Sequence, residues 1–123
     1  MAGRLGLARA KANGVLSKQS APALSLSKGR RATMFYVYIL KCFDGSYYIG
    51  HTEDVETRVE IHNAGRGAAY TRVRRPVVAV YREWQPDEGS AVRRELQIKN
   101  WSRAKKEALI RGDRDDLRRL SHL

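Results

Sequence analysis

The sequence predicts an α/β domain with a three-stranded antiparallel sheet flanked by helices. Two aromatic and β-branched runs, at residues 35–42 and 46–50, are joined by turn-forming residues and indicate a hairpin. A third run of this kind occupies residues 76–84. Apolar residues at helical spacing, each set next to a capping residue, fill the regions between and after these runs. A chain of 123 residues has room for one such domain.

Residues 1–33 differ in composition from the rest of the chain. They include seven basic residues but no acidic and no aromatic residue, so we expect this extension to be disordered. It can be a nucleic-acid-binding arm, a targeting peptide, or an over-extended gene start with Met34 as the true initiator, and we favour the last. The domain is then expected at 34–112, followed by a C-terminal tail at 113–123 that adds at most one loose turn.

The charge of the chain favours a polyanionic partner, and nucleic acid is the commonest one. The formal net charge is +11, but without the extension 17 basic and 13 acidic residues leave only +4, so charge alone does not decide the function. Cys42 is the single cysteine, which excludes an intramolecular disulfide and a multi-cysteine zinc site and suits the cytoplasm. We expect it to be a buried strand residue. No apolar run approaches the roughly 20 residues that span a membrane.

The first helix is expected to begin after the hairpin. Asp54 can cap it, and the Asn63-Ala64-Gly65 segment can end it. Val55, Val59 and Ile61 are expected on its inner side.

Two further helices are predicted after the third strand. Ser90 is expected to cap a helix over residues 90–99, with Ala91, Val92, Leu96 and Ile98 as its apolar members. Ser102 is expected to cap a helix over residues 102–111, which Gly112 ends.

The length of the hairpin loop decides whether two tyrosines share one face of the sheet. A two-residue Asp44-Gly45 loop would place Tyr38 and Tyr48 on opposite faces, because side chains alternate along a strand. A three-residue loop, with Gly45 in a left-handed conformation, pairs Leu40 with Tyr48 and puts both tyrosines on one face.

The spacing of these tyrosines continues into a longer pattern. Val37-Tyr38 is followed by Tyr48-Ile49-Gly50, and Arg58 and His62 then lie four residues apart, on one face of the predicted helix. This pattern resembles the GIY-YIG nuclease family, especially its small stand-alone members and the catalytic domain of the family's excinuclease. The resemblance covers residues 34–111.

The resemblance implies a GIY-YIG-like fold and favours the three-residue hairpin loop. Tyr36 replaces the leading glycine of the family signature. That departure is mild, because the chemistry belongs to the tyrosine hydroxyl. The additional C-terminal asparagine that many family members carry has no clear counterpart in this sequence.

The resemblance also implies a site for cutting phosphodiesters with one metal ion. Tyr38 would activate or orient the attacking water, and Tyr48 would position water or phosphate. Arg58 would stabilise charge on the phosphate, and His62 would hydrogen-bond a tyrosine hydroxyl or shuttle a proton. Glu95 would be the ligand of a single Mg²⁺ or Mn²⁺ ion. Without the resemblance, the tyrosines, Arg58 and His62 have the alternative interpretation of ordinary strand and helix residues. Glu95 then forms a salt bridge.

Two basic segments are candidates for contact with nucleic acid. Residues 65–76 look like a glycine- and arginine-rich segment of the small family members, and residues 102–106 also resemble them. Basic side chains can neutralise phosphates and an exposed tyrosine can stack on a base, although a solvated basic loop has the same composition. The expected contacts are Arg66, Tyr70, Arg72, Arg74, Arg75, Lys105 and Lys106.

The resulting hypothesis is a cytoplasmic, metal-dependent endonuclease that acts on DNA, with repair or recombination intermediates as candidate substrates. DNA is favoured over RNA, and no obligate protein partner is expected. One alternative is a weak or inactive nucleic-acid-binding module of the same fold. Another is a basic RNA-associated protein whose tyrosines only stack. Its binding would survive Glu95→Ala.

Overall fold

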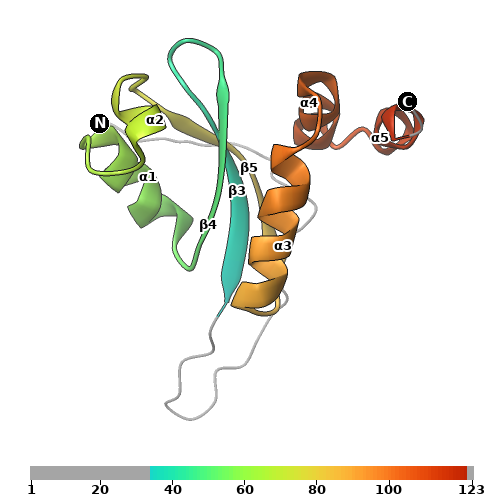
Figure 1. The fold of residues 1–123 in the computed structure, drawn as a ribbon, viewed down its shortest axis with the longest axis horizontal. Helices are drawn as coiled ribbons and strands as arrows, with labels where there is room; N and C mark the ends of the chain where they lie inside the picture. The colour runs from blue at the N-terminus through green and yellow to red at the C-terminus, as the bar shows by residue number, and fades with distance from the viewer. Residues whose placement is uncertain (1–33, 122–123) are drawn as a thin grey trace.

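A computed structural model describes residues 34–121, and the expectations about residues 1–33 lie outside that range. Helices lie on both sides of a three-stranded sheet (Figure 1). The elements in chain order are β3 (Phe35–Lys41), β4 (Tyr47–Thr52), α1 (Val55–Asn63), α2 (Ala69–Arg72), β5 (Val78–Gln85), α3 (Glu88–Lys99), α4 (Arg103–Arg111) and α5 (Arg114–Leu120). The predicted fold class is therefore confirmed.

The hairpin has the register that puts both tyrosines on one face. The strand order is β4-β3-β5, and both neighbouring pairs are antiparallel. Leu40 lies opposite Tyr48, and Tyr38 lies opposite Gly50. Gly45 has a φ of 87°, which a left-handed turn residue requires. The predicted three-residue loop is thus confirmed, and β4 is an edge strand of the sheet.

Each face of the sheet carries its own apolar core. Val37 and Ile39 of β3 pack with Ala91 and Ile98 of α3 on one face. On the other face the cluster around Tyr38 and Leu40 includes Val55 of α1, with Tyr48 and Val59 at its margin. This division follows from the alternation of side chains along β3. It places the two tyrosines on the α1 side of the sheet.

Several helix ends match the expected capping chemistry. Asp54 caps α1 by accepting a hydrogen bond from the backbone of Thr57 at 3.1 Å. Ser102 caps α4, and Gly112 ends it with a φ of 73°. The Asp54 cap fixes where α1 begins and hence which of its residues face the sheet.

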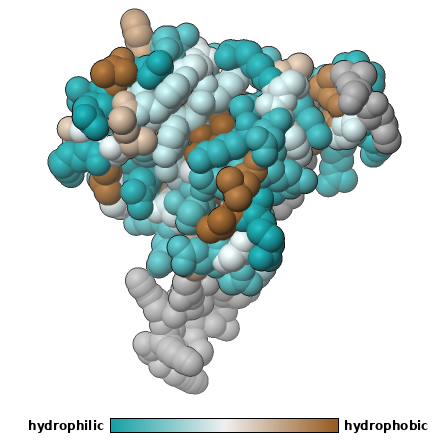
Figure 2. Space-filling model, viewed as in Figure 1, coloured by the Kyte–Doolittle hydropathy of each residue, from teal (hydrophilic) through white to brown (hydrophobic). Residues whose placement is uncertain are grey.

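Ser90 is not a helix cap, because Asp87 takes that role. The Asp87 carboxylate accepts from the backbone nitrogen of Ser90 at 2.7 Å, so α3 starts at Glu88. Only Ala91 and Ile98 of its expected apolar members are buried, while Val92 and Leu96 are 38% and 54% exposed. Figure 2 shows apolar groups of this kind over α3 on an otherwise largely hydrophilic face.

Two other boundaries differ from the prediction. The third strand begins at Val78 rather than at residue 76. The C-terminal tail forms the helix α5 rather than a loose turn, because Asp113 caps it and Leu117 packs against the core on the α3 side. Among residues 34–121, none of the helices has the length and apolarity needed to cross a membrane.

Candidate active site

Tyr38 lies directly against the backbone of Gly50 in the edge strand. A Cβ atom on Gly50 would come within 2.5 Å of the Tyr38 hydroxyl oxygen and within 2.7 Å of Cζ. Only glycine therefore leaves room for the tyrosine ring at this cross-strand position. The missing side chain lets the Tyr38 hydroxyl reach across β4 toward the sheet edge.

His62 meets both tyrosines on this face. Its Nε2 atom lies 3.2 Å from the Tyr38 hydroxyl, and its side chain is almost fully buried. The ring centroids of Tyr48 and His62 are 5.2 Å apart, in an edge-to-face arrangement. Tyr38, Tyr48 and His62, which are far apart in the sequence, therefore form one cluster.

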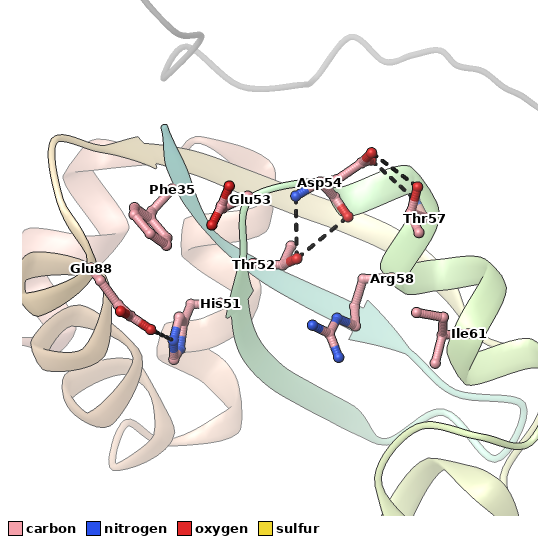
Figure 3. Close-up of a pocket in the computed structure, with 9 residues that line it drawn as sticks. All are labelled: Phe35, His51, Thr52, Glu53, Asp54, Thr57, Arg58, Ile61 and Glu88. Atoms are coloured by element: carbon pink, nitrogen blue, oxygen red, sulfur yellow. Dashed lines mark hydrogen bonds and ion pairs between the residues drawn. The ribbon is translucent and has the colours of Figure 1, made fainter. Parts of the chain in front are cut away.

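Arg58 lies one helical turn before His62 and lines a pocket of about 270 Å³ beside β4. Figure 3 shows its guanidinium extending from α1, with His51 and Glu88 on the far side of the pocket. The Nε atom of Arg58 is buried, and residues 34–121 provide it with no hydrogen-bond partner. A half-buried guanidinium whose Nε donor is unmet is suited to bind an oxyanion.

Glu95 lies on the α3 side of the sheet, where the side chains of His51 and Lys99 hold it. Its Oε1 atom is 2.6 Å from Nδ1 of His51, and its Oε2 atom is 2.7 Å from Nζ of Lys99. Burial raises the pKa of Glu95, but the hydrogen bonds with His51 and Lys99 outweigh that effect and keep the pKa below its ordinary value. Glu95 is therefore ionised at neutral pH.

The residues on the two sides of the sheet affect one another electrostatically. Burial raises the pKa of Tyr38 far above its ordinary value, and the charges of Tyr48 and Glu95 add to this, while Arg58 opposes it. Burial and the Arg58 charge both lower the pKa of His62. At neutral pH the site thus pairs a neutral phenol with a neutral imidazole, and the imidazole is the better proton acceptor.

The donor atoms around Glu95 fit one hydrated cation rather than an enclosed metal site. Within residues 34–121 there is no group of three or more His, Cys, Asp or Glu residues placed to hold a metal ion. Mg²⁺ commonly binds through one or two carboxylates and completes its shell with water and substrate phosphate. Glu95 is a half-buried, ionised carboxylate whose charge acts on Tyr38, so it meets that requirement.

Two of the predicted phosphate-binding arginines are engaged within the loop itself. Arg74 donates to the Asp44 carboxylate at 3.1 Å and to the Tyr70 carbonyl at 2.8 Å, and its guanidinium lies over the Tyr70 ring. Arg75 donates to the carbonyls of Arg72 and Asn63. These contacts hold the loop against α1 and the hairpin.

The other predicted contacts fall into two groups that the fold does not bring together. Arg66 and Arg72 are exposed, and no partner of either guanidinium occurs in the part of the chain that the structure describes. Lys105 and Lys106 lie on α4, which packs on the opposite face of the sheet, and Lys105 is 4.1 Å from the centre of the Trp101 ring.

Sequence reasoning missed three residues beside the predicted site residues: His51 at Glu95, and Gly67 and Thr71 at His62. His51 directly follows the Tyr48-Ile49-Gly50 motif, so strand alternation could have placed it on the Glu95 side. The Thr71 hydroxyl forms a hydrogen bond of 2.7 Å with Nδ1 of His62. A side chain on Gly67 would overlap that same nitrogen. No periodicity signal pointed to these two residues, because Gly67 lies in the segment after α1 and Thr71 lies in α2, a helix of only four residues.

Comparisons with known proteins agree on one family. The GIY-YIG catalytic domain family matches residues 34–108. The chain is 53% identical over 75 residues to UPF0213 protein SH2523 of Staphylococcus haemolyticus, covering 61% of this chain and 92% of that protein. It is also 53% identical over 76 residues to a UPF0213 protein of Staphylococcus aureus strain Mu3, covering 62% and 93%.

A solved structure is also similar to this chain. The solution NMR structure of the UPF0213 protein BH0048 from Bacillus halodurans is 45% identical, with 65% of this chain and 85% of that chain covered and a TM-score of 0.43. The names of these relatives state no activity.

Proposed function

Because this chain belongs to the GIY-YIG catalytic domain family, we propose that it is a metal-dependent endonuclease that hydrolyses phosphodiester bonds in DNA. The observation that carries the proposal is the Tyr38–His62 contact of 3.2 Å beside Arg58, whose buried Nε lacks a partner among the described residues. Repair or recombination intermediates are the substrates we would test first. A cytoplasmic location is part of the proposal, and the lone thiol of Cys42 agrees with it.

The proposed reaction starts with proton transfer through the Tyr38–His62 pair. Because the pKa of Tyr38 is raised, its hydroxyl is protonated at neutral pH. Tyr38 therefore takes a proton from the attacking water as it passes its own proton to Nε2 of His62. Tyr48, whose ring is edge-to-face with that of His62, would lie beside that water.

Arg58 stabilises the phosphate in this scheme. Its guanidinium is permanently charged, lines the pocket, and has a buried donor to offer to an oxygen of the phosphate. Negative charge grows on those oxygens during hydrolysis, so the interaction strengthens toward the transition state. The same charge lowers the pKa of His62 and keeps that base neutral.

Glu95 is the proposed protein ligand for Mg²⁺ or Mn²⁺. When bound, the ion would act as a Lewis acid on the phosphate oxygens. The carboxylate is already ionised, so binding requires no proton loss. His51 and Lys99 neutralise Glu95 in the ion-free protein, and one of these contacts has to open.

Arg66 and Arg72 are the proposed phosphate contacts beside the active site. Both guanidiniums are exposed, whereas Arg74 and Arg75 hold the loop through contacts within the chain. Exposed arginines add sequence-independent affinity by neutralising phosphates and releasing counterions. Lys105 and Lys106 on α4 remain proposed contacts on the opposite face of the sheet. The ring of Tyr70, whose centroid lies 6.3 Å from that of Tyr48, remains a proposed contact beside the active site.

Cleavage assays with the full chain test this proposal. Labelled single-stranded, duplex and branched DNA, with RNA for comparison, would be incubated with Mg²⁺, Mn²⁺ or a chelator. We expect products that need the metal and that disappear in Glu95→Ala while binding is retained. Glu60→Ala, which removes an exposed carboxylate from α1, is the matched control and should cleave normally.

The contacts of Glu95 with His51 and Lys99 support a second candidate function, a nucleic-acid-binding module without catalytic activity. Both carboxylate oxygens already have side-chain partners within the protein, His51 and Lys99. If these contacts never open, the folded protein binds every substrate and cleaves none, with or without metal. That result would replace the nuclease proposal.

A further inference from the structure

We propose that Thr71 is a positioning residue that holds His62 in the one tautomer able to accept the Tyr38 proton. The catalytic part of this inference rests on the proposed function, whereas the tautomer is a property of the folded protein alone. Gly67 and Thr71 would then serve the active site rather than the nucleic acid.

The tautomer follows from a chain of hydrogen bonds that begins at a carbonyl. The Thr71 hydroxyl has one proton and two acceptors within reach, the Ala68 carbonyl oxygen at 3.0 Å and Nδ1 of His62 at 2.7 Å, and we assign the proton to the carbonyl. The Thr71 oxygen then accepts from Nδ1 of His62, which is 2.7 Å away. The proton of the neutral imidazole is therefore on Nδ1.

The same assignment leaves Nε2 of His62 without a proton. With the proton on Nδ1, Nε2 carries a lone pair and accepts from the Tyr38 hydroxyl at 3.2 Å. If the proton were on Nε2 instead, the Thr71 hydroxyl would have to turn its one proton from the Ala68 carbonyl to Nδ1. Nε2 would then donate to Tyr38 and could not serve as its base.

The loop backbone makes this contact geometrically accessible. A Cβ atom on Gly67 would overlap Nδ1 of His62, so the absent side chain leaves the imidazole room beside the loop. Thr71 is fully buried, and its backbone nitrogen also donates to the Ala68 carbonyl at 3.1 Å. Both features hold the Thr71 side chain in place beside Nδ1 of His62, which a positioning residue requires.

The resulting proton transfer balances. An O–H bond of water and the O–H bond of Tyr38 break, while a new O–H bond on Tyr38 and an N–H bond on Nε2 of His62 form. The hydroxide so generated forms a bond to phosphorus as the bond to the leaving oxygen breaks, and that oxygen takes a proton from solvent. The imidazolium keeps its Nδ1–H bond to Thr71 throughout.

Nitrogen NMR of the full chain tests the tautomer without any cleavage assay. Two-bond ¹⁵N–¹H spectra at neutral pH distinguish the two imidazole tautomers, and His51→Gln and His122→Gln assign the signals. We expect the Nδ1–H form of His62 in the wild type and in Thr71→Ser, which keeps the hydroxyl. Thr71→Val, of similar shape without it, should shift His62 toward the Nε2–H form. A wild-type Nε2–H form, or an unchanged tautomer in Thr71→Val, would overturn the proposal.

Kinetics then test the catalytic consequence. We expect kcat to fall about 10–100-fold in Thr71→Val with little change in KM, and Thr71→Ser to recover most of it. Wild-type kcat in Thr71→Val would refute the positioning role. If the wild type cleaves nothing, the proposed function fails, and the spectrum still decides whether Thr71 sets the tautomer. Should Thr71→Val not fold, the wild-type spectrum and Thr71→Ala decide the same question.

Discussion

Nδ1 of His51 lies 2.6 Å from Oε1 of Glu95, and this contact joins the edge strand β4 to α3. Lys99 occupies the other carboxylate oxygen, so a cation that binds Glu95 competes with two side chains of the protein. His51 also lines the pocket that contains Arg58. The proposed metal ligand and the proposed phosphate ligand are thereby connected through one histidine at the sheet edge.

Removing Lys99 should strengthen divalent-metal binding. Lys99→Met frees one oxygen of Glu95 and removes a competing positive charge, and a partly exposed ion pair of this kind contributes up to about 1 kcal/mol. We expect Mn²⁺ to bind about 2–5-fold more tightly by isothermal titration calorimetry. Lys41→Met, an exposed lysine on β3, serves as the control. Unchanged affinity in Lys99→Met would show that Glu95 is not the ligand.

Gly50→Ala should abolish most of the activity without unfolding the protein. The added methyl group would overlap the Tyr38 hydroxyl, which has to move away from His62. A displacement of about 1 Å can cost about 100-fold in rate, and we expect at least that loss in kcat. Gly89→Ala is the matched control, because its Cβ atom meets nothing closer than 3.5 Å. Equal activity of the two variants would rule out the proposed role of the Tyr38 hydroxyl.

The rate should depend on pH through His62. Tyr38, Tyr48, Thr71 and the charge of Arg58 surround this imidazole, and burial, followed by Arg58, lowers its pKa below the ordinary value of 6.5. The base must be neutral, so we expect kcat to stay constant above 6.5 and to fall only at lower pH. A pH profile of single-turnover cleavage measures this. A decline that begins above 6.5 would contradict it.

The same pKa shift predicts the direction of a stability change. The unfolded chain binds a proton at His62 more readily than the folded protein, so the free energy of unfolding should decrease as pH falls below 6.5. The decrease should end once the pH is below the folded-state pKa. Urea unfolding of wild type and His62→Gln over this range isolates the contribution. A wild-type slope that persists fully in His62→Gln would assign it to other groups.

The buried carboxylate of Glu83 should be important for stability. Glu83 is 3% exposed and accepts hydrogen bonds from Tyr81 at 2.6 Å and from Arg94 at 2.7 Å, which ties β5 to α3. Removing one partner of a buried ion pair leaves the other uncompensated, so Glu83→Ala should cost about 3–5 kcal/mol. Urea denaturation measures the loss. Asp115→Ala, in an exposed pair with Arg118, should change stability by less than about 0.5 kcal/mol.

Arg72 should contribute to DNA binding, whereas Arg75 should contribute to stability. Arg72→Ala removes an exposed guanidinium, so affinity should fall and the slope of log K against log salt should decrease by about 1, with stability unchanged. Arg75→Ala removes donors to two backbone carbonyls and should lower the melting temperature. Fluorescence anisotropy at several salt concentrations and thermal unfolding separate these effects. Identical behaviour of the two variants would refute the distinction.

The sequence alone was sufficient for the sheet and for most of the tyrosine cluster. Alternation along β3 left two hairpin loops open, the family resemblance favoured the one that places Tyr38 and Tyr48 on one face, and helical spacing places Arg58 and His62 together. These relationships are local or depend on a single strand pairing, so the residue pattern contains them.

The tertiary structure decided which partners these side chains have. Packing of α3 against β4 brings His51 to Glu95, the short helix α2 brings Thr71 to His62, and Arg74 and Arg75 form hydrogen bonds with nearby backbone carbonyls. No periodicity encodes such contacts, because they join segments whose relative position depends on the whole packed core. The sequence therefore determined the elements and the candidate site, and only the folded chain determined the hydrogen-bond partners that set its protonation.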